Sequence, residues 1–76
     1  MKSIVHIHAG SSAYDASNDR EIVVTGRHFS DFEVQIREEI TDEDCNVIGE
    51  RVTDSIFTQQ EINNLFNRNG RVEFDD

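Results

Sequence analysis

The chain has 76 residues, of which 36% are hydrophobic, and it contains no proline. This length predicts a single domain, residues 1–76, with a core near the lower size limit for a fold that has neither a disulfide nor a metal. Sixteen acidic residues against seven basic ones give a net charge of −9, so nucleic-acid phosphates and anionic membranes would repel the chain, which excludes direct binding to either.

The cellular setting is indicated by two further features. The single cysteine, Cys45, cannot form an internal disulfide, which favours a reducing compartment. No apolar run approaches the roughly 20 residues that span a bilayer, and the amino terminus lacks the apolar region of a secretion signal. We therefore expect a cytoplasmic protein.

Residues 2–9 alternate and are rich in β-branched side chains, which predicts a strand with Val5 and Ile7 on one face. Residues 10–19 contain small and turn-forming side chains apart from Tyr14, and they predict a loop.

The strand pattern returns over residues 20–28, with Ile22 and Val24 facing the core. Gly26 interrupts this second strand and predicts a bulge or a close approach of backbone.

Residues 30–40 fit two interpretations. Apolar side chains alternate with polar ones, which is typical of a strand; they are Phe32, Val34, Ile36 and Ile40. A helix is the alternative, because Ser30 and Glu33 imitate a capping box and part of the apolar set is also spaced four apart. The β-branched content favours the strand, and so does the hairpin that the following residues complete.

Residues 41–46 are polar and predict the turn of this hairpin. The returning strand covers residues 47–56, in which Gly49 predicts a second bulge. Its apolar residues fall on one face, and they are Ile48, Val52 and Ile56.

Residues 58–69 predict a helix whose two ends are both marked. Thr58 and Glu61 form a T-x-x-E capping box at the start. Phe57 and Ile62 occupy the two positions of a hydrophobic staple there. At the other end, Arg68 suits the helix dipole in the last turn and Gly70 suits a left-handed residue beyond it. The apolar stripe is Ile62, Leu65 and Phe66.

A short last strand follows over residues 71–74, with Val72 and Phe74 inward.

The element order β-β-β-β-α-β predicts the α+β class. We expect two layers, in which a mostly antiparallel sheet of four to five strands carries the helix of residues 58–69 on one face. The other face of the sheet is left to water or to a partner.

The histidines are the first candidates for metal binding. His6 and His8 project from one strand face and His28 ends the next strand, so Cys45 or a carboxylate would have to complete a zinc site. A second closely spaced pair of ligands is missing, and we predict no metal. We expect these histidines to be polar surface residues.

A partial calcium-loop pattern begins at Asp42, with Asp44 and Asn46 at its third and fifth positions. The pattern then fails, because Val47 replaces the turn glycine and Thr53 replaces the bidentate glutamate.

Catalytic motifs are also missing, including nucleophile–base pairs and phosphate-binding glycine loops. We predict a non-enzymatic protein without cofactors.

Acidic residues crowd the predicted hairpin, and they are Glu38, Glu39, Asp42, Glu43, Asp44, Glu50 and Asp54. Glu73, Asp75 and Asp76 would join them if the last strand pairs nearby. Carboxylates about 5 Å apart across a sheet and about 7 Å apart along a strand approximate the spacing of phosphates, so this surface would suit a basic nucleic-acid groove. The alternative is a solvated face that guards strand edges against pairing.

The hairpin, the F-T-Q-Q-E-I-N-N-L-F helix and the acidic balance resemble the small phage-encoded inhibitors of bacterial defence, in particular a type I-F anti-CRISPR protein. The likeness covers roughly residues 32–70, and the chain departs from it by ending in a strand instead of a helix. The resemblance implies an inhibitor that works in the host-cell cytoplasm, binds a CRISPR effector and blocks its access to nucleic acid.

Two functional hypotheses follow. The first is an acidic protein-binding inhibitor, acting as a DNA mimic on a basic host protein or nucleoprotein complex through the seven hairpin carboxylates. The second is a structural or assembly module that forms a homodimer through the sheet face or edge left uncovered by the helix, because a chain this small benefits from oligomerisation.

Overall fold

The computed structural model describes residues 3–75 and shows the expected α+β fold, with strands in two sheets and one helix. Its elements in chain order are β1 (Ile4–Ile7), β2 (Ser12–Asp15), β3 (Arg20–His28), β4 (Asp31–Thr41), β5 (Val47–Phe57), α1 (Gln59–Phe66) and β6 (Arg71–Phe74). Within the described residues, no helix is long and apolar enough to span a membrane.

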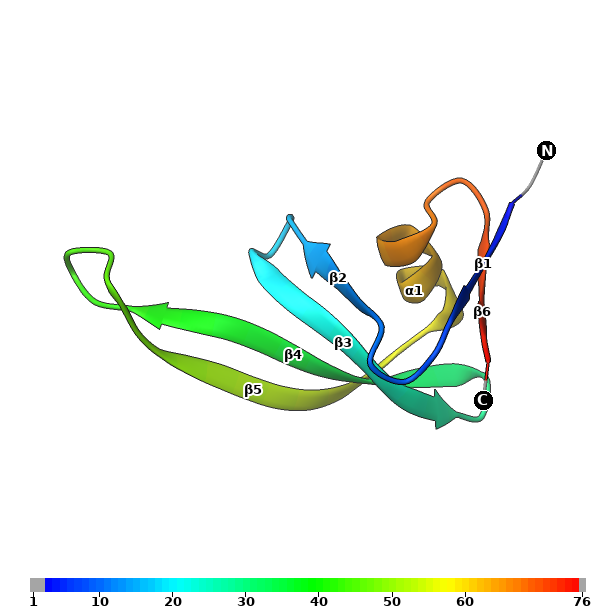
Figure 1. The fold of residues 1–76 in the computed structure, drawn as a ribbon, viewed down its shortest axis with the longest axis horizontal. Helices are drawn as coiled ribbons and strands as arrows, with labels where there is room; N and C mark the ends of the chain where they lie inside the picture. The colour runs from blue at the N-terminus through cyan, green and yellow to red at the C-terminus, as the bar shows by residue number, and fades with distance from the viewer. Residues whose placement is uncertain (1–2, 76) are drawn as a thin grey trace.

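The strands form two sheets instead of the single one that was predicted. β2, β3, β4 and β5 lie in that order in an antiparallel sheet, whereas β1 and β6 form a separate parallel pair. In that pair Ile4 lies opposite Arg71 and Ile7 opposite Phe74. The helix α1 and the β1–β6 pair lie together at one end of the molecule (Figure 1).

The prediction of a loop over residues 10–19 was wrong, because β2 lies within it and pairs with β3. Two backbone hydrogen bonds start this pairing: the Gly10 N–H donates to the Val24 carbonyl at 2.7 Å, and the Val24 N–H donates to Ser11 at 2.8 Å. Ala13 then faces Ile22 across the two strands. The sequence did not indicate this strand, because its mostly small and polar side chains do not alternate clearly between apolar and polar. Its formation depends on pairing with β3.

Residues 31–40 lie in a strand, as predicted for this segment, whereas Ser30 belongs to the turn before it. This strand, β4, pairs with strands on both sides. Both expected irregularities are present. The register of β3 on β4 shifts between Val24 and Gly26, and that of β5 on β4 shifts so that Gly49 lies opposite Ile40 and Val47 opposite Thr41. An extra residue therefore interrupts each strand at or beside its glycine.

The start of α1 is confirmed. Thr58 Oγ1 accepts the Glu61 backbone N–H at 3.2 Å, and Glu61 Oε1 accepts the Thr58 N–H at 3.2 Å. Phe57 and Ile62, the two staple residues, are both buried.

The end of α1 differs from the prediction. The helix ends at Phe66 with Asn67 as its C-cap, so Arg68 lies outside it, and Gly70 is not left-handed. The Asn67 side chain instead donates to the Ser3 carbonyl at 3.2 Å and to the Arg71 carbonyl at 3.3 Å. Gly70 is needed for close approach, because a Cβ there would overlap the Ser3 carbonyl oxygen.

One hydrophobic core joins the two sheets and the helix. Its buried members are Ile7, Ile22, Val24, Phe32, Val34, Ile36, Phe57, Ile62 and Val72, with Leu65, Phe66 and Phe74 packed against them. The Phe74 ring meets that of Phe32 edge-on, with centroids 6.3 Å apart. The inward assignments for β3, α1 and β6 are therefore confirmed, whereas in the first strand Ile7 is buried and Val5 is exposed.

Two apolar residues of β5, Val52 and Ile56, lie on the face of the sheet that points away from the core. Val52 is opposite Arg37 and Ile56 is opposite Glu33, and these partners alternate with the buried residues of β4. Val52 and Ile56 are each 47% exposed. The side of the sheet that the core leaves uncovered is hereafter called the open face.

The hairpin of β4 and β5 extends beyond the rest of the sheet (Figure 1). The pairing of β3 with β4 begins at Glu21 and Arg37, so residues 38–51 pair only with each other and are hereafter called the arm. This projection helps to explain the elongated shape of the molecule, 46 × 25 × 16 Å.

Candidate functional site

The arm gathers most of the predicted acidic site. Residues 38–51 contain six carboxylates and one arginine; the carboxylates belong to Glu38, Glu39, Asp42, Glu43, Asp44 and Glu50. Asp54, the seventh predicted residue, lies farther along β5, where it is opposite Gln35. Six of the seven predicted acidic residues therefore share one projecting element.

These carboxylates do not share one face. Glu39 lies opposite Glu50, and both project from the open face together with Asp54. Glu38 lies opposite Arg51 and projects from the other face. The arm therefore presents negative charge on both sides and at its tip, instead of one flat patch.

Asp42 shapes the tip of the arm. Its Oδ1 accepts the backbone N–H groups of Asp44 and Asn46, each at 2.9 Å. The bond from Asn46, followed by that from Asp44, holds the pKa of Asp42 below its ordinary value of 3.8. Asp42 is thus a turn-forming carboxylate, whereas Glu43 and Asp44 are exposed beside it.

Arginine offsets part of the negative charge where the arm begins. Arg37 Nε lies 3.4 Å from Glu50 Oε1, and both side chains are about half exposed. An ion pair this exposed contributes little stability. The arm therefore retains a strongly negative surface.

The acidic residues of the last strand do not join the arm. β6 pairs in parallel with β1, at the end of the molecule remote from the arm tip (Figure 1). Glu73 lies opposite His6, and Asp75 Oδ1 is 3.1 Å from His6 Nδ1. The condition for Glu73 and Asp75 to join the arm is not met, because β6 belongs to the other sheet; Asp76 lies outside the described residues.

The three histidines have separate neighbours. His6 approaches Asp75, His8 Nδ1 is 2.9 Å from the Ala9 carbonyl, and His28 Nδ1 is 3.7 Å from Glu33 Oε1. Cys45 lies far from them in the sequence, in the turn of the arm. In residues 3–75, no three His, Cys, Asp or Glu side chains are grouped as ligands for one metal ion.

The calcium-loop pattern lies at the arm tip. It is flanked by β4 and β5, whereas an EF-hand has helices on both sides. One Asp42 oxygen is already used by two backbone N–H groups of the turn.

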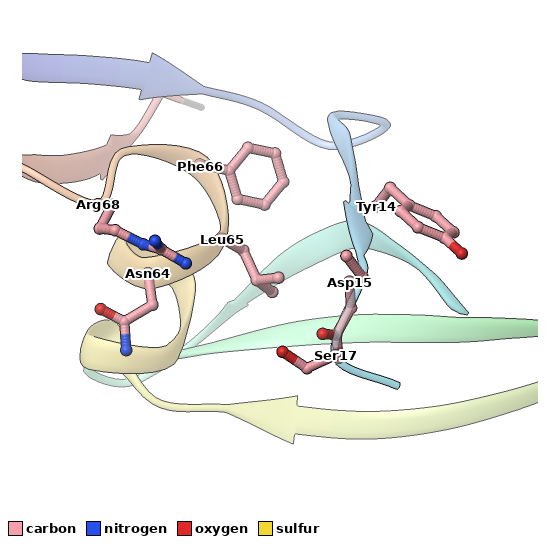
Figure 2. A pocket seen from close by; sticks show the side chains of 8 residues that line it. Tyr14, Asp15, Ser17, Asn64, Leu65, Phe66 and Arg68 are labelled. Carbon is pink, nitrogen blue, oxygen red and sulfur yellow. The ribbon is translucent and has the colours of Figure 1, made fainter. Parts of the chain in front are cut away.

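A hollow of about 710 Å³ separates the β2–β3 turn from α1. Leu65 and Phe66 project into this gap from the helix, whereas the Tyr14 ring points to the far side of β2 (Figure 2). Asp15 Oδ2 accepts Asn18 Nδ2 at 2.9 Å and Arg20 Nε at 3.0 Å. The bond from Asn18 and the charge of Arg20 lower the pKa of Asp15. This carboxylate therefore stabilises the β2–β3 hairpin.

A second hollow, of about 430 Å³, lies at the base of the arm. Its lining is Tyr14, Asp19, Arg20, Glu21, Arg37, Glu39, Thr41 and Glu50. The Tyr14 hydroxyl donates to Asp19 Oδ1. Sequence reasoning missed Tyr14 and Glu21 here, because their positions depend on strand pairing: Glu21 lies opposite Arg37 of β4, and Tyr14 lies opposite Glu21.

No protein-family model, curated protein or solved structure was found to match this chain.

Proposed function

We propose that this protein is a small acidic inhibitor that inserts its arm into a basic, nucleic-acid-binding surface of a partner protein. The projection of the arm beyond the core, with six carboxylates and one arginine, carries this proposal. Glu39 and Glu50 face each other across the strands roughly 5 Å apart, and the other four carboxylates of the arm add negative charge on its second face and at its tip. A partner groove occupied in this way is closed to its nucleic acid.

The class of partner follows from the same charge. A nucleic-acid groove presents lysine and arginine side chains, and long-range attraction to an acidic protein accelerates their association. The resemblance to anti-CRISPR inhibitors makes a CRISPR effector in the host-cell cytoplasm the first partner to test. On this proposal the protein acts by binding and carries out no reaction of its own.

The homodimer hypothesis is favoured by the exposed apolar residues of β5 and opposed by charge. Two copies paired antiparallel about Val52 would bring Ile48 against Ile56, and they would also place Glu50 against Asp54. Like charges directly opposite each other destabilise a strand pair. We expect sedimentation velocity to show a monomer, whereas a dimer at micromolar concentration would favour the assembly module.

The inhibitor proposal is tested by capture from host-cell lysate, followed by competition between the captured protein's nucleic acid and this chain. A triple variant, Glu38→Gln/Glu43→Gln/Asp44→Asn, removes three charges from the arm and leaves Asp42 in place to hold the turn. The matched control, Asp31→Asn/Glu73→Gln/Asp75→Asn, removes three charges elsewhere.

We expect the arm variant to lose about tenfold in competition and the control about twofold at most, with affinity falling as salt rises. Equal losses in the two variants would contradict the role of the arm. Competition that is insensitive to salt would contradict the electrostatic basis of the proposal.

A further inference from the structure

The outer edge of β5 is a long row of available backbone groups. β5 lies at the end of the four-stranded sheet and pairs only with β4 among the described residues. In an edge strand, every second residue directs its N–H and C=O away from the sheet. The 11 residues of β5 therefore offer a far longer template than β2, the four-residue strand at the other edge.

Charge is the main protection of this edge strand, through Glu50, Arg51 and Asp54. β5 contains no proline and no lysine, and its irregularity is confined to the arm end, near Gly49. Every residue of β5 is exposed except Ser55, which is half-buried, and Phe57, which is buried. The edge is thus accessible over most of its length.

Side chains on the open face of β5 alternate between acidic and apolar. Glu50, Val52, Asp54 and Ile56 follow one another there at every second residue. A hollow of about 390 Å³ adjoins Asp54 and Ile56 and is bounded by Thr25 and Glu33. A neighbouring strand placed on this edge would meet two carboxylates and two aliphatic side chains in a fixed order.

We infer that β5 binds an extended basic segment of a partner protein, which adds to the sheet as a fifth strand. This inference rests on the proposed function, and it specifies which strand of this protein contacts the partner. Lysine or arginine side chains of the segment would face Glu50 and Asp54, and aliphatic ones would face Val52 and Ile56. Main-chain hydrogen bonds would supply affinity, as in other complexes formed by strand addition.

Charge selects this occupant over the alternatives. A second copy of the chain brings Glu50 against Asp54 when the apolar residues are matched, and a nucleic acid is repelled by the net charge of −9. A basic polypeptide satisfies both the backbone groups and the carboxylates. The partner therefore presents alternating cationic and aliphatic residues on one face of an extended segment.

A pair of synthetic peptides tests the inference. The probe is a peptide of about nine residues in which lysine and valine alternate at every second position and threonine fills the positions between them. Its control has the same sequence with every backbone nitrogen methylated, so charge and side chains are kept and the backbone donors are lost. We expect the unmodified peptide to bind at least about tenfold more tightly, because its main-chain bonds contribute to affinity.

Amide hydrogen exchange locates the contact. The unmodified peptide should slow exchange within Val47–Phe57 and leave Ser12–Asp15, at the opposite edge, unchanged. A Val52→Lys variant, which places a cation at the centre of the edge, should weaken peptide binding about tenfold. Its matched control, Gln60→Lys on the exposed surface of α1, should change binding about twofold at most.

Two outcomes would overturn the inference in different ways. Equal binding of the two peptides without protection of β5 would mean that attraction is purely electrostatic, which contradicts strand addition and leaves the inhibitor proposal standing. Failure of both peptides to bind at about 50 mM salt, where attraction between charges is long-ranged, would contradict strand addition and the charge-based proposal together.

Discussion

Glu39 on β4 lies directly opposite Glu50 on β5, so two carboxylates face each other across the base of the arm. Like charges in this position oppose strand pairing. Arg37, 3.4 Å from Glu50 Oε1, offsets only part of the repulsion, because the ion pair is exposed. The arm thus carries a charge arrangement that costs stability.

Replacing one member of this pair should stabilise the protein. We expect Glu39→Lys to raise the free energy of unfolding by about 0.5 kcal/mol, because it converts a like-charge pair into an opposite-charge pair. Urea denaturation measures the change. Glu43→Lys alters net charge equally at the arm tip without a cross-strand carboxylate opposite it, and an equal gain there would show that net charge, not the pairing, is responsible.

Phe29 is held in a strained conformation in the two-residue turn between β3 and β4. Its φ is +58° and its side chain is 86% exposed, in a region of backbone space that favours glycine. We expect Phe29→Gly to be more stable than Phe29→Ala by about 1 kcal/mol, because alanine retains the strain. Thermal unfolding of the two variants makes the comparison, and an alanine variant as stable as the glycine variant would contradict it.

Gly70 allows two distant segments to approach each other. A Cβ at this position would overlap the carbonyl oxygen of Ser3, so we expect Gly70→Ala to cost about 1–3 kcal/mol of stability. Gly49→Ala is the control, because its Cβ would meet only the Ile40 side chain at 3.9 Å. Chemical denaturation should show little loss for the control, and equal losses would rule out the close approach as the cause.

Asp15 should make stability depend on pH. Its hydrogen bond from Asn18 and its pairing with Arg20 lower its pKa from the ordinary 3.8. The carboxylate therefore stabilises the fold above pH 3.8, and this contribution is lost as the pH falls through the lower folded-state pKa. Carbon NMR titration of the carboxyl groups should give Asp15 a pKa below 3.8.

The variant Asp15→Asn checks the same linkage through unfolding. We expect it to be less stable than the native chain at pH 7, with a difference that shrinks as the pH falls below 3.8. A difference that stays constant from pH 7 to about pH 2.5 would show that shape, not charge, matters at this position.

The sequence by itself determined the local features of this protein. The capping box of Thr58 and Glu61, the strand character of residues 30–40 and the irregularity at Gly26 depend on side chains a few positions apart. The alternation of polar and apolar residues also determined the α+β class. The crowding of carboxylates in one hairpin was visible for the same reason, because a hairpin joins neighbouring residues.

Only the tertiary structure decided which elements meet. β2 is a strand because β3 lies beside it, and the last strand leaves the main sheet because it pairs with β1. Gly70 and Ser3 are 67 positions apart, so no pattern of neighbouring residues predicts their contact. Likewise, the sequence placed Val52 and Ile56 on one face of a strand, but it did not say whether that face is buried. The core packs against the opposite face of the sheet, and Val52 and Ile56 are therefore on the open face.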